Sequence, residues 1–156
     1  MKERKDIKLI IVGDGSVKAK LKSKISETNV NIQLFDQQSV NVVKEMIKKA
    51  DIGLVSLSPN IYKYGYPSKI MTYLEQGKPI IAVLEKESEI VKLMEQDNYG
   101  FNISSSDPKI ISEFLIKLAK DESWKLNMSL NAKKAYEKYF SKDKILSKWS
   151  KILLNE

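Results

Sequence analysis

The chain has 156 residues, of which 42% are hydrophobic and 30% charged, and this composition is typical of a single globular domain. It contains no cysteine and no histidine, which excludes disulfides, Cys/His metal sites, thiol nucleophiles and histidine acid–base catalysis. The net charge is +7, but the lysines are spread along the chain and no arginine-rich tract occurs, so we expect no nucleic-acid partner.

No apolar run approaches the roughly 20 residues that a membrane-spanning helix needs. The amino terminus, Met-Lys-Glu-Arg-Lys-Asp, has the features of neither a signal peptide nor a transit peptide. We therefore expect a cytoplasmic protein, located in the cytosol or at the inner face of the membrane.

Patterns typical of strands and helices alternate along the chain. A continuous aliphatic run at residues 7–12 predicts a first strand, buried on both faces. Further strands are predicted at residues 29–35, 52–57, 79–84 and 100–103. Apolar residues at helical spacing predict helices at about residues 17–25, 40–50, 67–76, 89–95, 106–118, 124–139 and 142–154.

This order predicts an α/β fold, a Rossmann-like parallel sheet with helices on both faces and a C-terminal helical run over one edge. Residues 1–156 are expected to form one domain. Apolar residues on the inner sides of the helices are expected in the core, and they are Val17, Leu21, Ile25, Val40, Val43, Ile47, Ala50, Ile110, Ile111, Phe114, Leu115 and Leu118. Five aromatic residues are expected in the core or at an interface: Trp124, Tyr136, Tyr139, Phe140 and Trp149.

The most informative segment is residues 66–82. Pro67 suits the first turn of a helix, and Ile70 and Leu74 then fall on one helical face. Gly77 supplies a left-handed cap, and Pro79 opens a buried strand. The segment therefore predicts a helix whose N-terminus opens beside a sheet, which is a favourable place for an anion.

The pattern P-S-K-x-x-x-Y-x-x-x-G-K-P-I-I-A in this segment resembles the donor-binding element of bacterial retaining glycosyltransferases of family 4, which have the GT-B fold. The resemblance is closest to the members that assemble capsule and exopolysaccharide. Other stretches follow in the same order as in that family: residues 8–15, ending in Gly-Asp-Gly, and residues 50–55, 98–101 and 140–149. The resemblance covers nearly the whole chain, as the C-terminal, donor-binding half of such an enzyme.

That half normally begins with a strand and a helix that this sequence lacks, since residues 1–6 match only the tail of the helix. The resemblance places the missing strand in the middle of the sheet, so two strands would be left with unpaired edges. We expect an amino-terminal acceptor-domain chain or a homodimer to cover them, unless the chain is a fragment. Without an acceptor-binding domain, we expect this hexosyltransferase-type domain to be inactive alone. Two alternatives are a docking subunit of a two-chain glycosyltransferase and a relic that binds no nucleotide.

The resemblance also implies site residues. Ser68 and Lys69 would contact the diphosphate of a nucleotide-sugar, the alternative being a helix cap and a solvated lysine. Thr72 stands where many members carry a glutamate for the ribose, and the family's other glutamate would fall at Tyr64. Glu89 matches a glutamate near the donor sugar, although a first-turn carboxylate would also explain it.

Two loops complete the candidate set. Gly13 and Gly15 could approach the nucleotide or simply form a tight turn, because Lys18 stands where a dinucleotide fingerprint needs a third glycine. Tyr62, Tyr64 and Tyr66, just before Pro67, could stack on a base or sugar, with Gly65 permitting a close backbone approach, or they could cover the end of the sheet. Glu85 and Glu87 follow the next strand at the same end of the sheet. In this family the diphosphate itself helps to take the acceptor proton, so we predict no catalytic carboxylate pair, no metal and no cofactor besides the nucleotide-sugar substrate.

Overall fold

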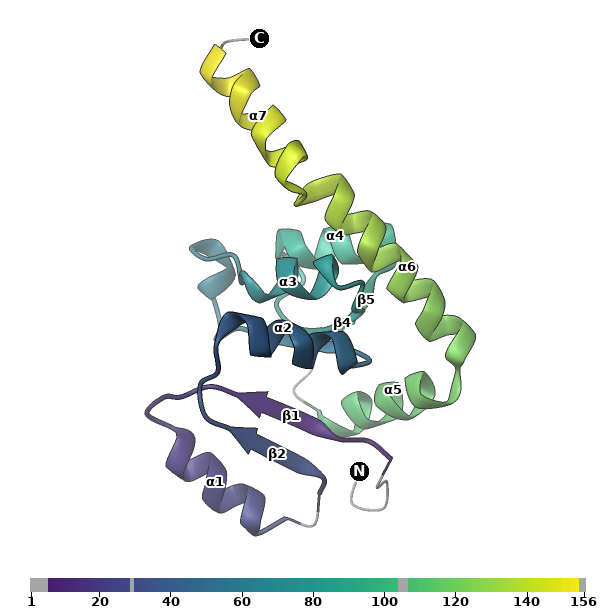
Figure 1. The fold of residues 1–156 in the computed structure, drawn as a ribbon. Helices are drawn as coiled ribbons and strands as arrows, with labels where there is room; N and C mark the ends of the chain where they lie inside the picture. Colours follow the sequence, from purple (N-terminus) through teal and green to yellow (C-terminus); the bar gives the residue numbers. More distant parts are fainter. Residues whose placement is uncertain (1–5, 29, 104–106, 155–156) are drawn as a thin grey trace.

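The structure is a computed structural model that describes residues 6–28, 30–103 and 107–154 (Figure 1). The strands are β1 (Leu9–Val12), β2 (Ile32–Phe35), β3 (Gly53–Ser56), β4 (Ile80–Val83) and β5 (Gly100–Asn102). The helices are α1 (Lys18–Ser26), α2 (Val40–Lys49), the short 3-10 turn η1 (Ile61–Lys63), α3 (Lys69–Glu75), α4 (Glu89–Asp97), α5 (Pro108–Lys120), α6 (Glu122–Tyr139) and α7 (Lys142–Leu154). The predicted strand start at residue 29, the helix start at residue 106 and the helix tail at residues 1–5 lie outside the described residues.

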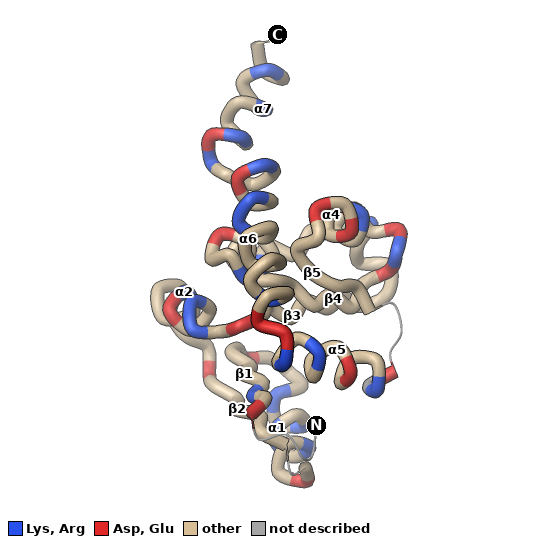
Figure 2. The backbone as a smooth tube through the Cα atoms, turned by 90° about the vertical axis from the view of Figure 1, so that its right-hand side faces the viewer, with Lys and Arg blue, Asp and Glu red and all other residues tan. Residues whose placement is uncertain are grey.

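The predicted α/β fold with parallel strands is confirmed, but the strands form two sheets rather than one. The first sheet has the order β1-β2 and the second the order β3-β4-β5, with every pair parallel. Within the described residues, β1 pairs with β2 alone and β3 with β4 alone. Figures 1 and 2 both show β1 between β2 and the second sheet, so the break in the sheet lies between β1 and β3.

The core is built around the second sheet, which carries helices on both faces. On one face, α3, α4 and α6 pack on β3 and β4 through a cluster that includes Ile70, Leu74 and Ile80, all fully buried. On the other face, α5 contributes Phe114, whose ring stacks on Phe101 at a centroid distance of 4.4 Å. The predicted burial of Ile70 and Leu74 in α3 and of Phe114 and Leu118 in α5 is confirmed. The predicted burial of Ile110 is wrong, because its side chain is 40% exposed.

The part of the chain before β3 has no comparable core. None of the described residues before Gly53 is buried. The prediction that residues 7–12 are buried on both faces is wrong, since Ile10 is 43% exposed, and Val40 at the start of α2 is 71% exposed. The physical reason is that β1, α1 and α2 contribute no residue to either core cluster, so these side chains are only partly removed from water.

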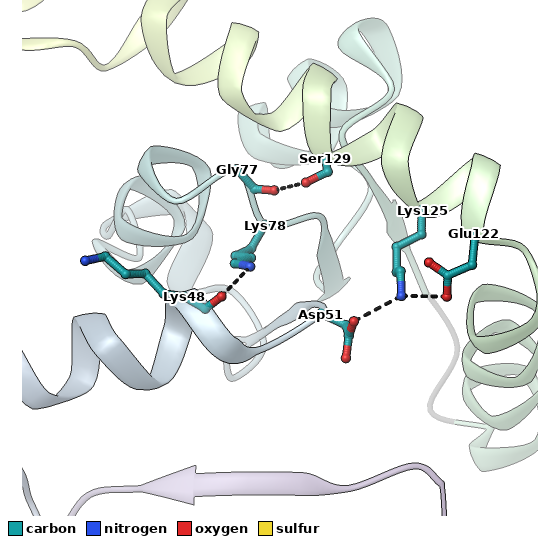
Figure 3. A network of polar contacts seen from close by, with 7 residues as sticks. All are labelled: Lys48, Asp51, Gly77, Lys78, Glu122, Lys125 and Ser129. Atoms are coloured by element: carbon teal, nitrogen blue, oxygen red, sulfur yellow. Dashed lines mark hydrogen bonds and ion pairs between the residues drawn. The ribbon is translucent and has the colours of Figure 1, made fainter.

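The turn from α3 into β4 has the predicted form. Gly77 adopts a left-handed conformation with φ 62°, and its N–H donates to the Leu74 carbonyl at 2.9 Å. Ser129 of α6 donates its hydroxyl to the Gly77 carbonyl (Figure 3). The helix cap, the following strand and α6 are therefore tied together at one point.

Polar contacts join α2 to the second sheet at the amino-terminal ends of β3 and β4 (Figure 3). Lys78 Nζ, before β4, donates to the Lys48 carbonyl at 2.8 Å. Asp51, before β3, accepts from Lys125 Nζ at 3.1 Å, and Lys125 also pairs with Glu122 at 2.9 Å. This network lies at the end of the second sheet opposite to the predicted site, and its role is structural.

Candidate functional site

The candidate site lies at the carboxyl ends of β3 and β4, where ligands bind in open parallel sheets. The chain leaves β3 through η1 toward α3, and it leaves β4 through Glu85 toward α4. The two loops are joined directly, because the Asn60 N–H donates to Glu85 Oε1 at 2.7 Å. Segments that are about 25 residues apart in sequence thus form one surface.

Ser68 and Lys69 stand at the N-terminus of α3, as predicted. Ser68 occupies the N-cap position in a helical conformation, and its side chain makes no capping hydrogen bond. The first turn is closed by the backbone instead, with the Ile70 N–H donating to Pro67 O at 3.1 Å and the Met71 N–H to Ser68 O at 3.2 Å. Ser68 and Lys69 are exposed and Pro67 is half-buried, so the hydroxyl and the ammonium group are accessible to a ligand.

Tyr66 precedes α3 and Glu89 begins α4, and the charge of Glu89 acts on the Tyr66 phenol. The Tyr66 ring is 37% exposed and packs on Phe140 with a centroid distance of 5.8 Å. Burial, followed by the charge of Glu89, raises the pKa of Tyr66, so the phenol stays protonated and can donate a hydrogen bond. Glu89 is the first residue of α4 and is exposed.

The other predicted residues of this loop differ in exposure. Tyr64 is 88% exposed, so it does not cover the sheet end, whereas Tyr62 is half-buried. Gly65 is exposed and lies two residues after the end of η1. Thr72 is half-buried and lies one turn after Ser68, on the same face of α3.

Gly13 and Gly15 lie beyond the break in the sheet, after β1. The Gly13 N–H donates to Phe35 O at 3.1 Å, and a Cβ atom at either glycine would meet no atom within 4 Å. In Figure 1 the arrows of β1 and β2 end on the side where the segment leading into α3 also lies. The two glycines therefore share an end of the molecule with the α3 loop, but they form a separate surface.

An ion triad beside Gly13 and Gly15 was not predicted. Lys18 Nζ lies 2.6 Å from Asp14 Oδ1 and 2.5 Å from Asp36 Oδ1. The hydrogen bond from Lys18 lowers the pKa of Asp14, and the bonds to Asp14 and then Asp36 raise the pKa of Lys18. The available signal was an aspartate shortly after each of two neighbouring parallel strands.

Asn102, the last residue of β5, was also missed. Its side-chain Oδ1 accepts from the Leu84 N–H at 3.2 Å, and its Nδ2 donates to the Leu84 carbonyl at 3.1 Å. Leu84 is the first residue after β4, so the amide side chain extends the β4–β5 pairing and fixes the start of the Glu85 loop. The signal for this role was a single amide at the end of an otherwise apolar strand.

Other features of the described chain do not coincide with these loops. Shallow hollows lie along α6 and are lined by Leu130, Lys133, Lys134, Glu137 and Lys138 and by Asp97, Asn131 and Ala135.

No group of three or more acidic side chains in residues 6–28, 30–103 and 107–154 is placed to hold a metal ion. None of the described helices is long and apolar enough to cross a membrane. Basic residues are distributed over α1, α2, α5, α6 and α7 (Figure 2).

The chain matches a family model and is similar to a curated glycosyltransferase. The family model described as "Glycosyl transferases group 1" matches residues 1–135. The probable glycosyltransferase WbjE of Pseudomonas aeruginosa is 26% identical over 119 residues, which are 76% of this chain and 28% of WbjE.

Two solved structures have a similar fold. The crystal structure of Anabaena Alr3699/HepE in complex with UDP superposes with a TM-score of 0.75 and 14% identity over 98% of this chain and 42% of HepE. The structure of WaaG, a glycosyltransferase involved in lipopolysaccharide biosynthesis, gives a TM-score of 0.64 and 18% identity over 93% of this chain and 37% of WaaG. The chain therefore spans less than half the length of each of these relatives.

Proposed function

The chain belongs to the glycosyl transferases group 1 family, and on that premise we propose that it is the donor-binding half of a retaining glycosyltransferase of the family 4 type. Its reaction would belong to the synthesis of capsule, exopolysaccharide or a cell-surface glycolipid. The observation that carries the proposal is the surface at the carboxyl ends of β3 and β4, where the loop leading to Ser68 and Lys69 is joined by the Asn60–Glu85 hydrogen bond to the loop leading to Glu89.

The diphosphate of the nucleotide-sugar would bind at the N-terminus of α3. The first N–H groups of a helix have no partner within the helix and attract anions. The Ser68 and Lys69 amides and the Lys69 ammonium group offer several donors and one positive charge to phosphate oxygens. UDP in the HepE complex supports a nucleoside diphosphate as the ligand class for this fold.

The remaining contacts follow from what each side chain can donate or accept. The Thr72 hydroxyl would face the ribose, and Tyr64, with Gly65 beside it, would stack on the base. Glu89 would accept from the sugar hydroxyls, while the Tyr66 phenol donates a hydrogen bond. Gly13 and Gly15 would approach the nucleotide from beyond the sheet break, which requires the two halves of the domain to be held in place.

We propose that the chain is inactive alone and that another polypeptide or a second copy completes it. The nucleotide-sugar is the substrate, and no resident cofactor or metal takes part. The working location is the cytoplasm, at the inner face of the membrane when a partner is anchored there.

The test is a thermal-shift screen of the full chain with UDP, GDP and ADP. A ligand at 100 times its dissociation constant adds about 2.7 kcal/mol to the free energy of unfolding, which gives a clear shift of the melting temperature. The shift should be lost in Lys69→Ala and kept in Lys92→Ala, which removes an equivalent exposed lysine from α4. A cooperative melting transition whose temperature is unchanged by UDP, GDP and ADP would contradict the proposal.

The second candidate function is that of a docking subunit, and α7 is the observation that favours it. Trp149, expected in a core or interface, is 57% exposed, and Leu146 and Leu153 on the same helix are 53% and 73% exposed. Figure 1 shows α7 extending away from the sheets. Tight binding of a membrane-bound amino-terminal partner, with no change of melting temperature on adding nucleotide, would support a docking subunit. If the chain binds neither the partner nor a nucleotide, the result would support a relic domain.

A further inference from the structure

Helix α7 carries an apolar stripe that the rest of the described chain leaves exposed. We infer that α7 binds the surface of an anionic lipid bilayer, with this stripe at the boundary of the acyl chains and a row of lysines against the headgroup phosphates. The inference goes beyond the proposed function, because it assigns α7 to lipid rather than to a protein partner. It rests on the residues of α7 and does not depend on nucleotide binding.

The apolar residues of α7 lie on one side of the helix. Residues three and four positions apart share a helical face, which places Ile145, Trp149 and Ile152 in one row. Leu146 and Leu153 lie beside that row, each one residue further along the chain. Ile145 is half-buried and the other four side chains are exposed. The stripe formed by these five residues is therefore available to another apolar surface.

A row of lysines borders the stripe. Lys144, Lys148 and Lys151 have the same spacing as the Ile145 row and each precedes a member of it by one residue, so they line one edge of the stripe. Asp143 is the one acidic residue between Lys142 and Leu154. Among the described residues, no acidic side chain forms an ion pair with any of the three lysines. The helix therefore presents positive charge that is not neutralised, and Figure 2 shows basic residues repeated along it.

This combination of side chains fits the surface of an anionic bilayer. Amphipathic helices that lie in the membrane interface carry Trp and Leu on one face and Lys on the polar face. The carbon chain of a lysine can cover apolar surface while its ammonium group reaches a phosphate. Tryptophan prefers the level of the headgroups, which suits Trp149 in the second half of the helix.

The length of α7 determines how it would lie. Its 13 residues correspond to a length of about 20 Å at a rise of ~1.5 Å per residue. The hydrocarbon core of a bilayer is about 30 Å thick, so α7 is too short to cross it and would lie along its surface. Figure 1 shows α7 extending away from the sheets, so a flat surface can reach it.

The charge of α7 argues against a second copy as the occupant. Two α7 helices paired through their stripes would bring their lysine rows close together, and one aspartate in each helix cannot neutralise them. Like charges placed together at an interface weaken association. Anionic headgroups supply the opposite charge along the whole helix, and each lysine near such a surface raises the affinity about fivefold.

The test measures binding of the full chain to unilamellar vesicles by co-sedimentation. Vesicles of phosphatidylglycerol and phosphatidylcholine should bind the chain about tenfold or more tightly than vesicles of phosphatidylcholine alone. Brominated phosphatidylcholine in the anionic vesicles should quench the fluorescence of Trp149, which reports contact with the acyl chains. Trp124 packs on Phe114 with a ring-centroid distance of 5.2 Å and should not be quenched, so Trp149→Phe should abolish the quenching.

Two pairs of variants make the result specific. Leu146→Ser removes an apolar side chain from the stripe and should weaken vesicle binding about tenfold, whereas Leu130→Ser, at an α6 position that is also 53% exposed, should not. Lys148→Gln should weaken binding about fivefold, whereas Lys22→Gln, at an exposed position of α1, should leave it nearly unchanged. The replaced α7 side chains are exposed, so the urea midpoints of these variants should equal that of wild-type protein.

Four results would overturn the inference. They are no binding to anionic vesicles, equal binding to both kinds of vesicle, binding without quenching of Trp149, and equal binding by Leu146→Ser and wild-type protein. A dimer that Leu146→Ser dissociates, without vesicle binding, would assign the stripe to a second copy.

The lipid surface and the donor site can fail separately. Vesicle binding without a UDP-induced shift of the melting temperature would leave the lipid surface standing and contradict the donor site. A UDP-induced shift without vesicle binding would leave only the proposed function. Tight binding of a protein partner through α7, again without vesicle binding, would assign the helix to the docking subunit.

Discussion

The substitution Gly100→Ala tests whether the β4–β5 pairing beneath the candidate site is as tight as the structure requires. Gly100 is opposite Ile80 in the parallel register. A Cβ atom at position 100 would overlap the Ile80 carbonyl oxygen and would lie 2.7 Å from Met94 Sδ and 3.1 Å from the Ile80 carbonyl carbon. The methionine could rotate away, but the backbone of β4 could not.

The expected loss of stability follows from two effects. Overpacking a core position costs typically about 1–3 kcal/mol. Moving β5 outward also weakens ladder bonds such as Ile80 N–H to Tyr99 O at 3.1 Å and Ile103 N–H to Ala82 O at 2.8 Å, each worth about 1 kcal/mol. We therefore expect the free energy of unfolding to fall by about 2–4 kcal/mol, a large part of the ~5–15 kcal/mol of an ordinary domain.

Urea unfolding followed by circular dichroism measures this change. Gly15→Ala is the matched control, because it makes the same chemical change where no atom lies within 4 Å, and it should alter stability by less than ~0.5 kcal/mol. If the two variants unfold at the same urea concentration, the close approach of β5 to β4 is not a feature of the folded protein, and the reasoning is refuted.

Two further predictions concern side chains that hold the site loops and α6. Asn102→Ala removes the hydrogen-bond partners of the Leu84 N–H and C=O and should lower the free energy of unfolding by about 1–3 kcal/mol. An unchanged urea midpoint would show that the Asn102 amide does not stabilise the fold. Asp121 caps α6 by accepting from the Trp124 N–H at 2.9 Å, and this bond lowers the pKa of Asp121, so Asp121→Ala should lower the urea midpoint at pH 7. Because the pKa of Asp121 is lower in the folded state, the stabilisation by the cap is complete above the unfolded pKa of about 4 and is lost as the pH falls through the folded pKa. The urea midpoints of wild-type protein and variant should therefore converge in acid. A difference between the two midpoints that stays constant with pH would contradict the assignment.

Local signals in the sequence predicted the elements of the second sheet well. Gly77 and Pro79 determine where α3 ends and where β4 follows, because each acts through its own backbone geometry, whereas α3 begins at Lys69, two residues after the predicted start at Pro67. The Ile70 and Leu74 face of α3 is buried as predicted. These features depend on residues only a few positions apart.

Burial in the first part of the chain could not be predicted in the same way. The aliphatic run containing Ile10 has the pattern of a strand covered on both faces, but burial depends on elements that pack against it from elsewhere. The family resemblance predicted unpaired edges on two strands, and the break between β1 and β3 agrees with that prediction. Val40 has helical spacing and is nevertheless exposed for the same reason.

The candidate site was predicted as a set of residues and not as an arrangement. Sequence order placed Ser68 and Lys69 at a helix start, which the structure confirms. The hydrogen bond from Asn60 to Glu85, which joins the two loops, depends on loop conformations that no local pattern encodes. The roles of Asn102 and Lys18 were missed because their hydrogen bonds to Leu84 and Asp36 join segments that are 18 residues apart in sequence.

The most direct test of the donor-binding account is an NMR titration of the ¹⁵N-labelled chain with UDP. The account predicts that the amide signals of Ser68, Lys69 and Thr72 shift in a saturable way together with that of Glu89. The signals of the exposed lysine-rich face of α6 around Lys134 should stay in place. Shifts confined to α6, or no shift anywhere as UDP is raised to millimolar concentration, would contradict the account.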